Sequence, residues 1–399
     1  MSFSGSHAFF TRAFYKSFFD YVRSKNINEQ EKGENNSCKP FDFSSYGKYI
    51  DQKISKDIQQ RINNRSSHSL TFCQSRTIHF VYEFDEKEKG KQKVDTVVTL
   101  TVTDFETEND LNEMMDQIEL VVRVYFGFVR ALKISRVTTH LHITCFLTHF
   151  EKKLPDRKED PLTPFHVNSG LTYFTNPIQI ILFRKEEVQK VLIHELTHYF
   201  EIEQRIPISP SLNSFIQERF GISNDPRLPE AVTDFWACYV NVLFSSCFDL
   251  QLFLLNGKGK EKEKQKEKQK ENKTKFQSIT NSKLKYEIDF IVIQASKVIS
   301  HIDGCLSFSI DSKNERRKKR EKKNEETHVI AYYIVKAIMF MSFQKYLNLF
   351  YQYTKQNPKQ GSSRVSDEIQ KDLELKMPSI CQNLPSFRSL QTSLRMSSP

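Results

Sequence analysis

The pattern of hydrophobic and polar positions divides the chain into a polar start followed by strand-like and then helical segments. Residues 1–70 are polar and weakly patterned, so we expect ordered structure to begin after them. β-Branched and aromatic residues predict strands over 76–84 and 94–105, joined as a β-hairpin by a charged link. Apolar residues at helical spacing predict a helix over 109–128, and 141–147 has the composition of a further strand.

The second half of the chain predicts mainly helices. The turn signal Asn176-Pro177 precedes an apolar strand expected over 178–183. Apolar positions then recur with a helical period, and Pro229 stands at the first position of one such segment, where its missing N–H costs nothing. Helices are expected over 185–204, 229–255, 283–302 and 327–353. This order of elements favours the α+β class, with a small mixed or antiparallel sheet and further buried helices.

Composition and charge change this picture in two places. With 38% hydrophobic residues, the 399-residue chain has enough apolar material for a large core, which excludes wholesale disorder. Two charged runs carry nine of the ten formal positive charges: 257–275 has nine lysines against four glutamates, and 313–326 has eight basic against four acidic residues. The remainder is nearly neutral, so a broad nucleic-acid-binding face is not expected. Both runs are predicted to be solvated, disordered insertions, and 313–326 is also readable as a nuclear-import or nucleic-acid patch.

Five regions are therefore expected. They are a polar, partly disordered N-terminal region (1–70), a β-containing subdomain with the catalytic core (71–256), a disordered Lys/Glu insertion (257–275), a helical subdomain (276–355, interrupted by 313–326) and a flexible tail (356–399).

The sequence gives no sign of export or of membrane insertion. The longest apolar candidates, 235–255 and 329–350, are interrupted by polar and charged residues, so we expect them to be buried core helices. Seven scattered cysteines without a CxxC pair are typical of reduced thiols in an intracellular protein. We therefore expect a soluble protein of the cytoplasm or nucleus, with no membrane partner and an oligomeric state that the sequence does not set.

The segment VLIHELTHYF contains an HExxH pattern, formed by His194, Glu195 and His198. Four residues make about one helical turn, so both histidines project from one face and can each present a ring nitrogen to one Zn²⁺. Glu195 lies beside them as the candidate general base. A catalytic two-histidine site also needs a third protein ligand that leaves one position open for water.

Glu230, in PEAVTDFWA at the start of the next long helix, is the candidate third ligand. Asp234 lies one turn further on the same face, where its carboxylate could accept the free N–H of a ligating imidazole. Two acids on an otherwise apolar helix are costly unless a cation and a donor meet them. A metal ion and a histidine N–H would meet that requirement.

HELTH followed by EAVTD resembles the gluzincin group of zinc metallopeptidases, which includes thermolysin and the zinc aminopeptidases and has the pattern HExxH…ExxxD. The resemblance covers about residues 165–240 and implies a zincin-like catalytic unit. It implies His194, His198 and Glu230 as ligands of one Zn²⁺, Glu195 as general base, and Asp234 as partner of the first motif histidine.

The chain departs from the known patterns at several positions. Pro229 stands where thermolysin-like enzymes have Asn, so the outer partner of the second histidine is not assigned. Glu201 and Gln204 occupy positions where the extended metzincin pattern needs Gly and His. No GxMEN motif of the aminopeptidase type is present, which favours an endopeptidase.

Two flanking segments are weaker candidates for the site. In gluzincins an edge strand pairs with the substrate backbone, and Asn168, Ser169 and Gly170 resemble that strand in position; a loop leading into a core strand is an equal alternative. In 327–353, His328, Tyr332 and Lys336 recur every four residues along one stripe. Tyr332 or His328 could donate to the oxyanion of the reaction, whereas a solvent-facing stripe is the plainer interpretation.

The sequence thus predicts zinc-dependent hydrolysis of a protein or peptide substrate, with Glu195 assisting the attack of water. The alternatives are a catalytically inactive metal-binding protein, a chromatin- or DNA-associated protein on the same scaffold that uses 313–326, and a structural helical protein with a fortuitous motif.

Overall fold

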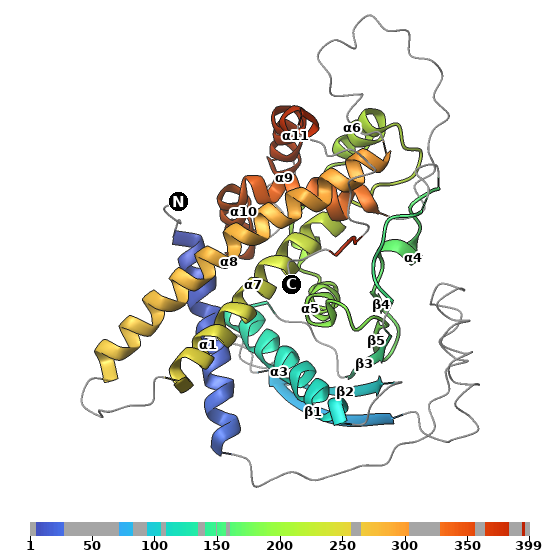
Figure 1. Cartoon of the computed structure of the whole chain (residues 1–399). Coiled ribbons are helices and arrows are strands. Elements are labelled where there is room, and N and C mark those ends of the chain that lie inside the picture. The colour runs from blue at the N-terminus through green and yellow to red at the C-terminus, as the bar shows by residue number, and fades with distance from the viewer. Residues whose placement is uncertain are drawn as a thin grey trace, which may run out of the picture. The chain divides into compact units, whose positions relative to one another are not determined.

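The computed structural model describes residues 5–27, 72–82, 94–104, 109–134, 140–148, 150–156, 160–256, 265–302, 328–355, 364–382 and 393–395, and the structural findings concern these residues (Figure 1). The described elements confirm a mixed α+β protein with one small mixed sheet. The helices are α1 (Gly5–Ile27), α3 (Asn109–Ala131), α4 (Pro164–Val167), α5 (Val188–Tyr199), α6 (Pro210–Phe220), α7 (Pro229–Asn256), α8 (Gln265–Ile302), α9 (Lys336–Met341), α10 (Phe343–Lys355) and α11 (Arg364–Gln382). A 3₁₀ turn, η3, spans Glu203–Arg205, and a π-helical turn, η5, spans Ile330–Val335.

The sheet has the order β1-β2-β3-β5-β4. Its strands are β1 (Phe72–Tyr82), β2 (Val94–Asp104), β3 (His140–Leu147), β4 (Gly170–Tyr173) and β5 (Ile178–Leu182). β1 and β2 pair antiparallel, as the predicted hairpin requires, whereas β2, β3 and β5 are parallel neighbours. β4 pairs antiparallel with β5 and forms one edge of the sheet in the described part of the chain.

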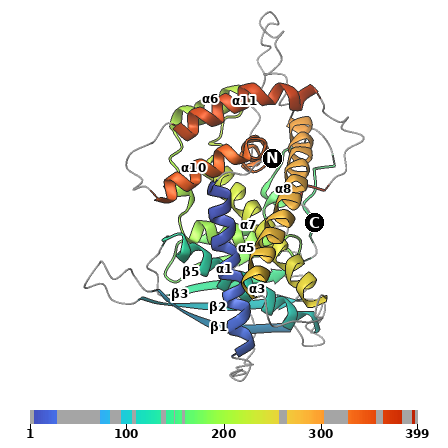
Figure 2. The same cartoon turned by 90° about the vertical axis from the view of Figure 1, so that its left-hand side faces the viewer.

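The chain divides into two compact units, of which the sheet unit comprises Phe19–Lys152 and Pro164–Phe200. In this unit α3 packs on β1 and β2, and also contacts α5 (Figure 2). The strands contribute alternating apolar side chains such as Val98, Leu100 and Ile143, each no more than 1% exposed. This burial explains why β-branched residues dominate these segments.

The helical unit comprises Met1–Phe18, Lys153–Thr163 and Glu201–Pro399. α7 is its central helix and contacts α8, α9 and η5. Aromatic side chains from the first part of α1 pack edge-on against α7, with Phe10 on Trp236 and Phe14 on Phe244. α6 and α11 lie side by side (Figure 2).

Among the described helices, only α7 contains a stretch, Pro229–Gln251, that is long and apolar enough to cross a membrane by length and composition. In the structure 83% of that stretch is buried inside the protein. Core helices of soluble proteins share this property, which fits the expected buried helix.

Three segments expected to lack structure contain helices. α1 (Gly5–Ile27) lies in the polar region 1–70, so the expectation that order begins only after residue 70 is wrong: its side chains Phe10, Phe14 and Phe18 are fully buried and hold the helix.

α8 begins at Gln265, so 265–275 is helical although we expected disorder over 257–275. Lys, Glu and Gln are strong helix formers, and the buried side chains of Phe276, Thr280 and Leu284 fix the helix just beyond them. Residues 257–264 and the run 313–326 lie outside the described residues.

The expected flexible tail contains α11. Its buried side chains follow a four-residue spacing, at Val365, Ile369, Leu373 and Met377. The predicted helix over 327–353 is divided into η5, α9 and α10. Cysteines 145, 238 and 247 are free thiols as expected, but Cys381 is disulfide-bonded, so the expectation of reduced thiols is wrong there.

Candidate metal centre

Helix α5 carries both histidines of the HExxH segment. Its apolar stripe, which includes Leu192, Ile193 and Leu196, is fully buried and fixes one side of the helix in the sheet unit. His194 is buried and His198 is half-buried. The two Nε2 atoms lie 3.1 Å apart, with ring centroids separated by 4.8 Å, so both imidazoles point to one place.

The distance between the two Nε2 atoms is close to that expected for two nitrogen ligands of one metal ion. Two nitrogen ligands at about 2.0–2.1 Å from a tetrahedral Zn²⁺ lie roughly 3.3 Å apart. The observed 3.1 Å between the His194 and His198 Nε2 atoms is close to that value. The two rings are therefore placed for a metal ion without a change of helix geometry.

Hydroxyl groups fix the rotation of α5 about its axis. Thr197, inside the HExxH segment, donates from Oγ1 to the Ile193 carbonyl at 2.7 Å. The same Oγ1 is 2.8 Å from the Tyr125 hydroxyl on α3, which completes a buried bridge between the two helices. The bridge fixes the rotation of α5 at Thr197, three residues after His194 and directly before His198.

Glu195 is buried beside β4. Its Oε2 accepts a hydrogen bond of 2.8 Å from the Thr172 hydroxyl on that strand. A Cβ on Gly170 would lie 3.0 Å from Glu195 Oε1 and 2.8 Å from atoms of Leu182 and Val191. Only glycine therefore allows β4 to lie this close to the carboxylate.

The predicted substrate segment, Asn168 to Gly170, leads directly into β4. The Asn168 carbonyl accepts from Arg184 Nε at 2.9 Å, and the Ser169 carbonyl accepts from the Phe183 N–H at 3.0 Å. Only Gly170 belongs to the edge strand itself, which continues to Tyr173. The backbone available at the edge thus begins at the last of the three predicted residues.

Glu230 lies in the first turn of α7, where its N–H donates to the Arg227 carbonyl at 2.9 Å. Its side chain is half-buried, and the Tyr332 hydroxyl donates to Oε2 at 3.3 Å. The candidate ligand and a candidate oxyanion donor are therefore direct neighbours within the helical unit.

Asp234 is fully buried one turn further along α7. Its Oδ2 is 2.6 Å from Lys336 Nζ, and both side chains are at most 1% exposed. The polar stripe of His328, Tyr332 and Lys336 thus faces α7, and the solvent-facing interpretation is wrong for Tyr332 and Lys336. A sequence pattern cannot show which neighbour a polar stripe meets.

His328 stands at the end of the same stripe. It is half-buried, with its ring centroid 6.3 Å from that of Tyr332. Burial lowers the pKa of His328 and Arg227 acts in the same direction, while Glu230 and Asp225 oppose the change. The neutral imidazole is therefore favoured.

His194, His198 and Glu230 form a group that could hold a metal ion. Each offers one ligand atom, and these atoms lie within 4.8 Å of one another. The three residues predicted as ligands therefore form a possible metal site. Their position alone does not identify the metal, so the choice of metal rests on the chemistry of the donor atoms.

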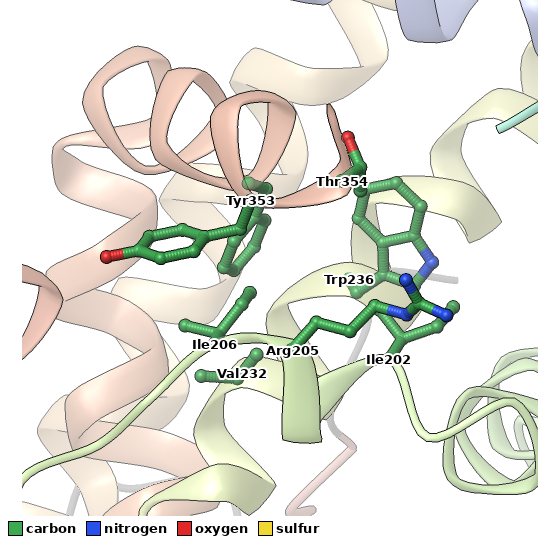
Figure 3. A pocket seen from close by; sticks show the side chains of 8 residues that line it. Ile202, Arg205, Ile206, Val232, Trp236, Tyr353 and Thr354 are labelled. Atoms are coloured by element: carbon green, nitrogen blue, oxygen red, sulfur yellow. The ribbon is translucent and has the colours of Figure 1, made fainter. Parts of the chain in front are cut away.

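A small cavity elsewhere in the helical unit is lined mainly by apolar side chains and, at about 10 Å³, has room for about one water molecule. Figure 3 shows Arg205 and Trp236 among the side chains that line this cavity. None of the predicted site residues lines it.

Comparison with known proteins found no match: no protein-family model, no curated protein and no solved structure matches this chain.

Sequence reasoning missed two residues that contact the site. Thr172 donates a hydrogen bond to Glu195, 23 residues later in the sequence. Lys336 pairs with Asp234, 102 residues earlier. Lys336 was visible as part of the stripe, but its acid partner was not.

Proposed function

We propose that the protein is a zinc-dependent peptidase of the gluzincin type, with a zincin-like catalytic unit. The observation that carries the proposal is the group of His194, His198 and Glu230. Beside it lies Glu195, which follows His194 in the sequence, is buried and does not belong to the group. A purely structural metal site has no need of Glu195 in that position. This residue therefore favours catalysis over metal storage.

The residues present suit zinc better than calcium or magnesium. Two imidazole nitrogens and one carboxylate form the donor set of known catalytic zinc sites, whereas the harder cations prefer all-oxygen sites. The 3.1 Å separation of the two Nε2 atoms supports the same ion. Three protein ligands also leave a position for water or substrate.

When bound, zinc would lower the pKa of a coordinated water and polarise a carbonyl oxygen. Glu195 would take a proton from the attacking water as its oxygen bonds to the scissile carbonyl carbon. The same carboxylic acid would then give that proton to the amine nitrogen as the C–N bond breaks. The Thr172 hydroxyl, 2.8 Å from Oε2, favours the ionised form that this role needs.

The edge strand β4 is where we place the substrate. An extended peptide could add to the side of β4 opposite β5, where no strand among the described residues pairs with it, with main-chain hydrogen bonds from Gly170 onward. Tyr332, whose hydroxyl already reaches Glu230, is better placed than His328 to donate to a developing oxyanion. We infer a protein or peptide substrate cleaved internally by a soluble, intracellular enzyme.

The decisive experiment combines metal analysis with a cleavage assay. Purified wild type, His198→Ala and Glu195→Gln are analysed for zinc by mass spectrometry after dialysis. They are then incubated with fluorescent casein, with peptides blocked at both ends and with the same peptides unblocked. We expect zinc in wild type and Glu195→Gln, a large loss of zinc in His198→Ala, and cleavage by wild type alone.

Three results would decide against the proposal. Equal zinc in all three proteins, or none in any, would exclude the metal site. Zinc binding without cleavage by wild type would favour the inactive metal-binding alternative. Cleavage of unblocked peptides only would replace the endopeptidase by an exopeptidase.

A further inference from the structure

The described chain ends with a short segment, residues 393–395, that docks on the helical unit and is called the terminal segment below. Ser393 forms an isolated antiparallel bridge with Lys153. The Ser393 carbonyl accepts a hydrogen bond from Lys297 Nζ on α8 at 2.9 Å. The terminal segment, Lys153 and α8 belong to one compact unit, so these contacts lie within the helical unit.

Leu394 anchors the terminal segment. Its side chain is fully buried, whereas Ser393 and Arg395 on either side are half-buried. The Leu394 carbonyl accepts a hydrogen bond from the Tyr333 hydroxyl on η5 at 2.6 Å. Two side-chain donors and a β-bridge thus reach the main chain of the segment, while its middle side chain is removed from water. Main-chain hydrogen bonds combined with buried side chains are how proteins recognise an extended peptide that adds to an exposed edge.

The connection to α11 makes the terminal segment comparable to a tethered ligand. α11 ends at Gln382, so residues 383–392 join it to the segment. A tether of about ten residues gives its end an effective concentration on the order of millimolar. Because the segment is docked in the structure, the same sequence offered as a free peptide should bind with a dissociation constant below that concentration.

The partner of Leu394 lies in an unusual turn. η5 is π-helical, and turns of this kind are rare and often occur at functional sites. Tyr333 donates to the terminal segment, and the preceding residue, Tyr332, donates to Glu230. A peptide bound in place of the segment would therefore contact the same turn that contacts the candidate metal ligand.

We infer that the helical unit contains a binding site for an extended peptide with a leucine anchor, and that the chain's own terminal segment occupies it. Lys153 pairs with the main chain of the peptide, and Lys297 and Tyr333 donate to two successive carbonyls. The buried place of the Leu394 side chain selects an apolar residue at that position. No metal takes part, so the site does not depend on the proposed function.

Fluorescence polarisation of a labelled peptide of residues 389–399 tests the inference on the full-length chain. Leu394→Asp puts a charge on the anchor and should release the chain's own segment, so we expect this variant to bind the free peptide saturably. Wild type should bind the peptide at least about 10-fold more weakly, because its tethered segment competes for the site. The same peptide carrying Leu394→Asp should bind neither protein.

A second substitution tests where the peptide binds. Tyr333→Phe, added to Leu394→Asp, removes one hydrogen bond to the peptide and should weaken binding by about 2–10-fold. Tyr286→Phe in the same background is the matched control, because that tyrosine is 59% exposed on α8. It should leave peptide binding unchanged. If Leu394→Asp does not fold by circular dichroism, Leu394→Ala takes its place.

Three results would overturn the inference. Folded Leu394→Asp without saturable binding would exclude a separable peptide site. Equal binding by wild type and Leu394→Asp would mean that the peptide binds elsewhere on the chain. Equal effects of Tyr333→Phe and Tyr286→Phe would exclude η5 from the site. Zinc analysis enters none of these measurements, so failure of the peptide site and failure of the proposed function are told apart.

Discussion

The two halves of the candidate metal centre are held by different kinds of interaction. The histidine half, on α5 and β4, uses uncharged groups: a buried hydroxyl bridge, a threonine hydroxyl that donates to Glu195 and one glycine that permits close packing. The carboxylate half, on α7, η5 and α9, uses a buried ion pair one helical turn from Glu230, which a tyrosine hydroxyl contacts. Short neutral contacts fix the positions of side chains, whereas an ion pair also changes the charge near Glu230.

The sheet unit also contains a buried ion pair, which can be compared with the Lys336–Asp234 pair of the helical unit. Lys152 Nζ and Glu187 Oε2 are 3.0 Å apart with side chains at most 1% exposed, at the residue that precedes α5. Glu187 adopts a left-handed conformation with φ of 59°, and its carbonyl accepts the Val191 N–H. This pair is two turns from His194 and fixes where α5 begins, so burial alone does not give an ion pair a role in the site.

Substituting Tyr332 tests the carboxylate half most strongly. If its hydroxyl stabilises the oxyanion, Tyr332→Phe should lower kcat by about 10²–10³-fold with little change in KM. The measurement is steady-state cleavage of a blocked peptide, with zinc content followed in parallel. His328→Gln is the comparison and should retain most activity. A loss of zinc rather than of kcat would show that Tyr332 only supports Glu230.

Lowering the pH should reduce the stability of the helical unit through one buried histidine. His7 in the helical unit is fully buried, and burial lowers its pKa from 6.5 to about 4. A lowered pKa means that the unfolded chain takes up a proton first, so this residue costs stability progressively as pH falls from 6.5 to 4. At 1.36 kcal/mol per pH unit the full cost is about 3 kcal/mol.

Urea unfolding at pH 7.5 and pH 4.5, followed by circular dichroism, measures this cost. His7→Asn keeps a polar group near the Tyr239 hydroxyl, which is 3.1 Å from Nδ1. We expect the substitution to remove much of the drop in unfolding free energy between the two pH values. An unchanged drop would mean that other groups control the acid response.

A side chain at position 170 tests whether the close packing of β4 against α5 is needed in the histidine half of the centre. In Gly170→Ala the new Cβ would stand 2.8 Å from two side-chain carbons and 3.0 Å from the Glu195 carboxylate. We expect a loss of about 1–3 kcal/mol in unfolding free energy, as for other overpacked cores, and a clear loss of cleavage. Gly221→Ala, at a surface position with open space, serves as comparison for stability but has strain of its own at φ 66°. Unchanged stability and activity would show that β4 can move away from α5.

Substituting Thr172 should reduce cleavage less than substituting Tyr332. Thr172→Val removes the 2.8 Å hydrogen bond to Glu195 but keeps the shape of the side chain. Hydrogen bonds to charged groups contribute about 1.5–3 kcal/mol, so we expect cleavage to fall by roughly 10-fold or more and its acidic pH limit to rise. A pH–rate profile measures both, and Thr172→Ser should restore the limit. An unchanged acidic limit would mean that the hydroxyl does not influence the base.

The sequence predicted the elements whose pattern is strong and local. The HExxH helix, the β1–β2 hairpin and the apolar helix that carries Glu230 all have clear periodicity, and the structure confirms them. The spacing of His194 and His198 also sufficed to predict that their rings would converge, because one helical turn fixes that relation.

What the sequence did not predict depends on contacts between distant segments. Whether Lys336 faces solvent or Asp234 is decided by a helix about 100 residues earlier, and nothing local to the stripe records it. α11 was missed because serine, glutamine and proline dominate the tail, although the spacing of Val365 and Ile369 was available as a signal. The start of α8 was missed because lysine and glutamate suit both a solvated helix and a disordered run.

Trp236 gives the helical unit an optical label of its own. It is the single tryptophan of the chain, it is buried on α7, and Phe10 of α1 packs edge-on against it. Its fluorescence emission therefore reports the helical unit and the docking of the first helix, while the sheet unit contributes only tyrosine. Comparing tryptophan emission with a probe of secondary structure during unfolding would reveal whether the two units melt together or one after the other.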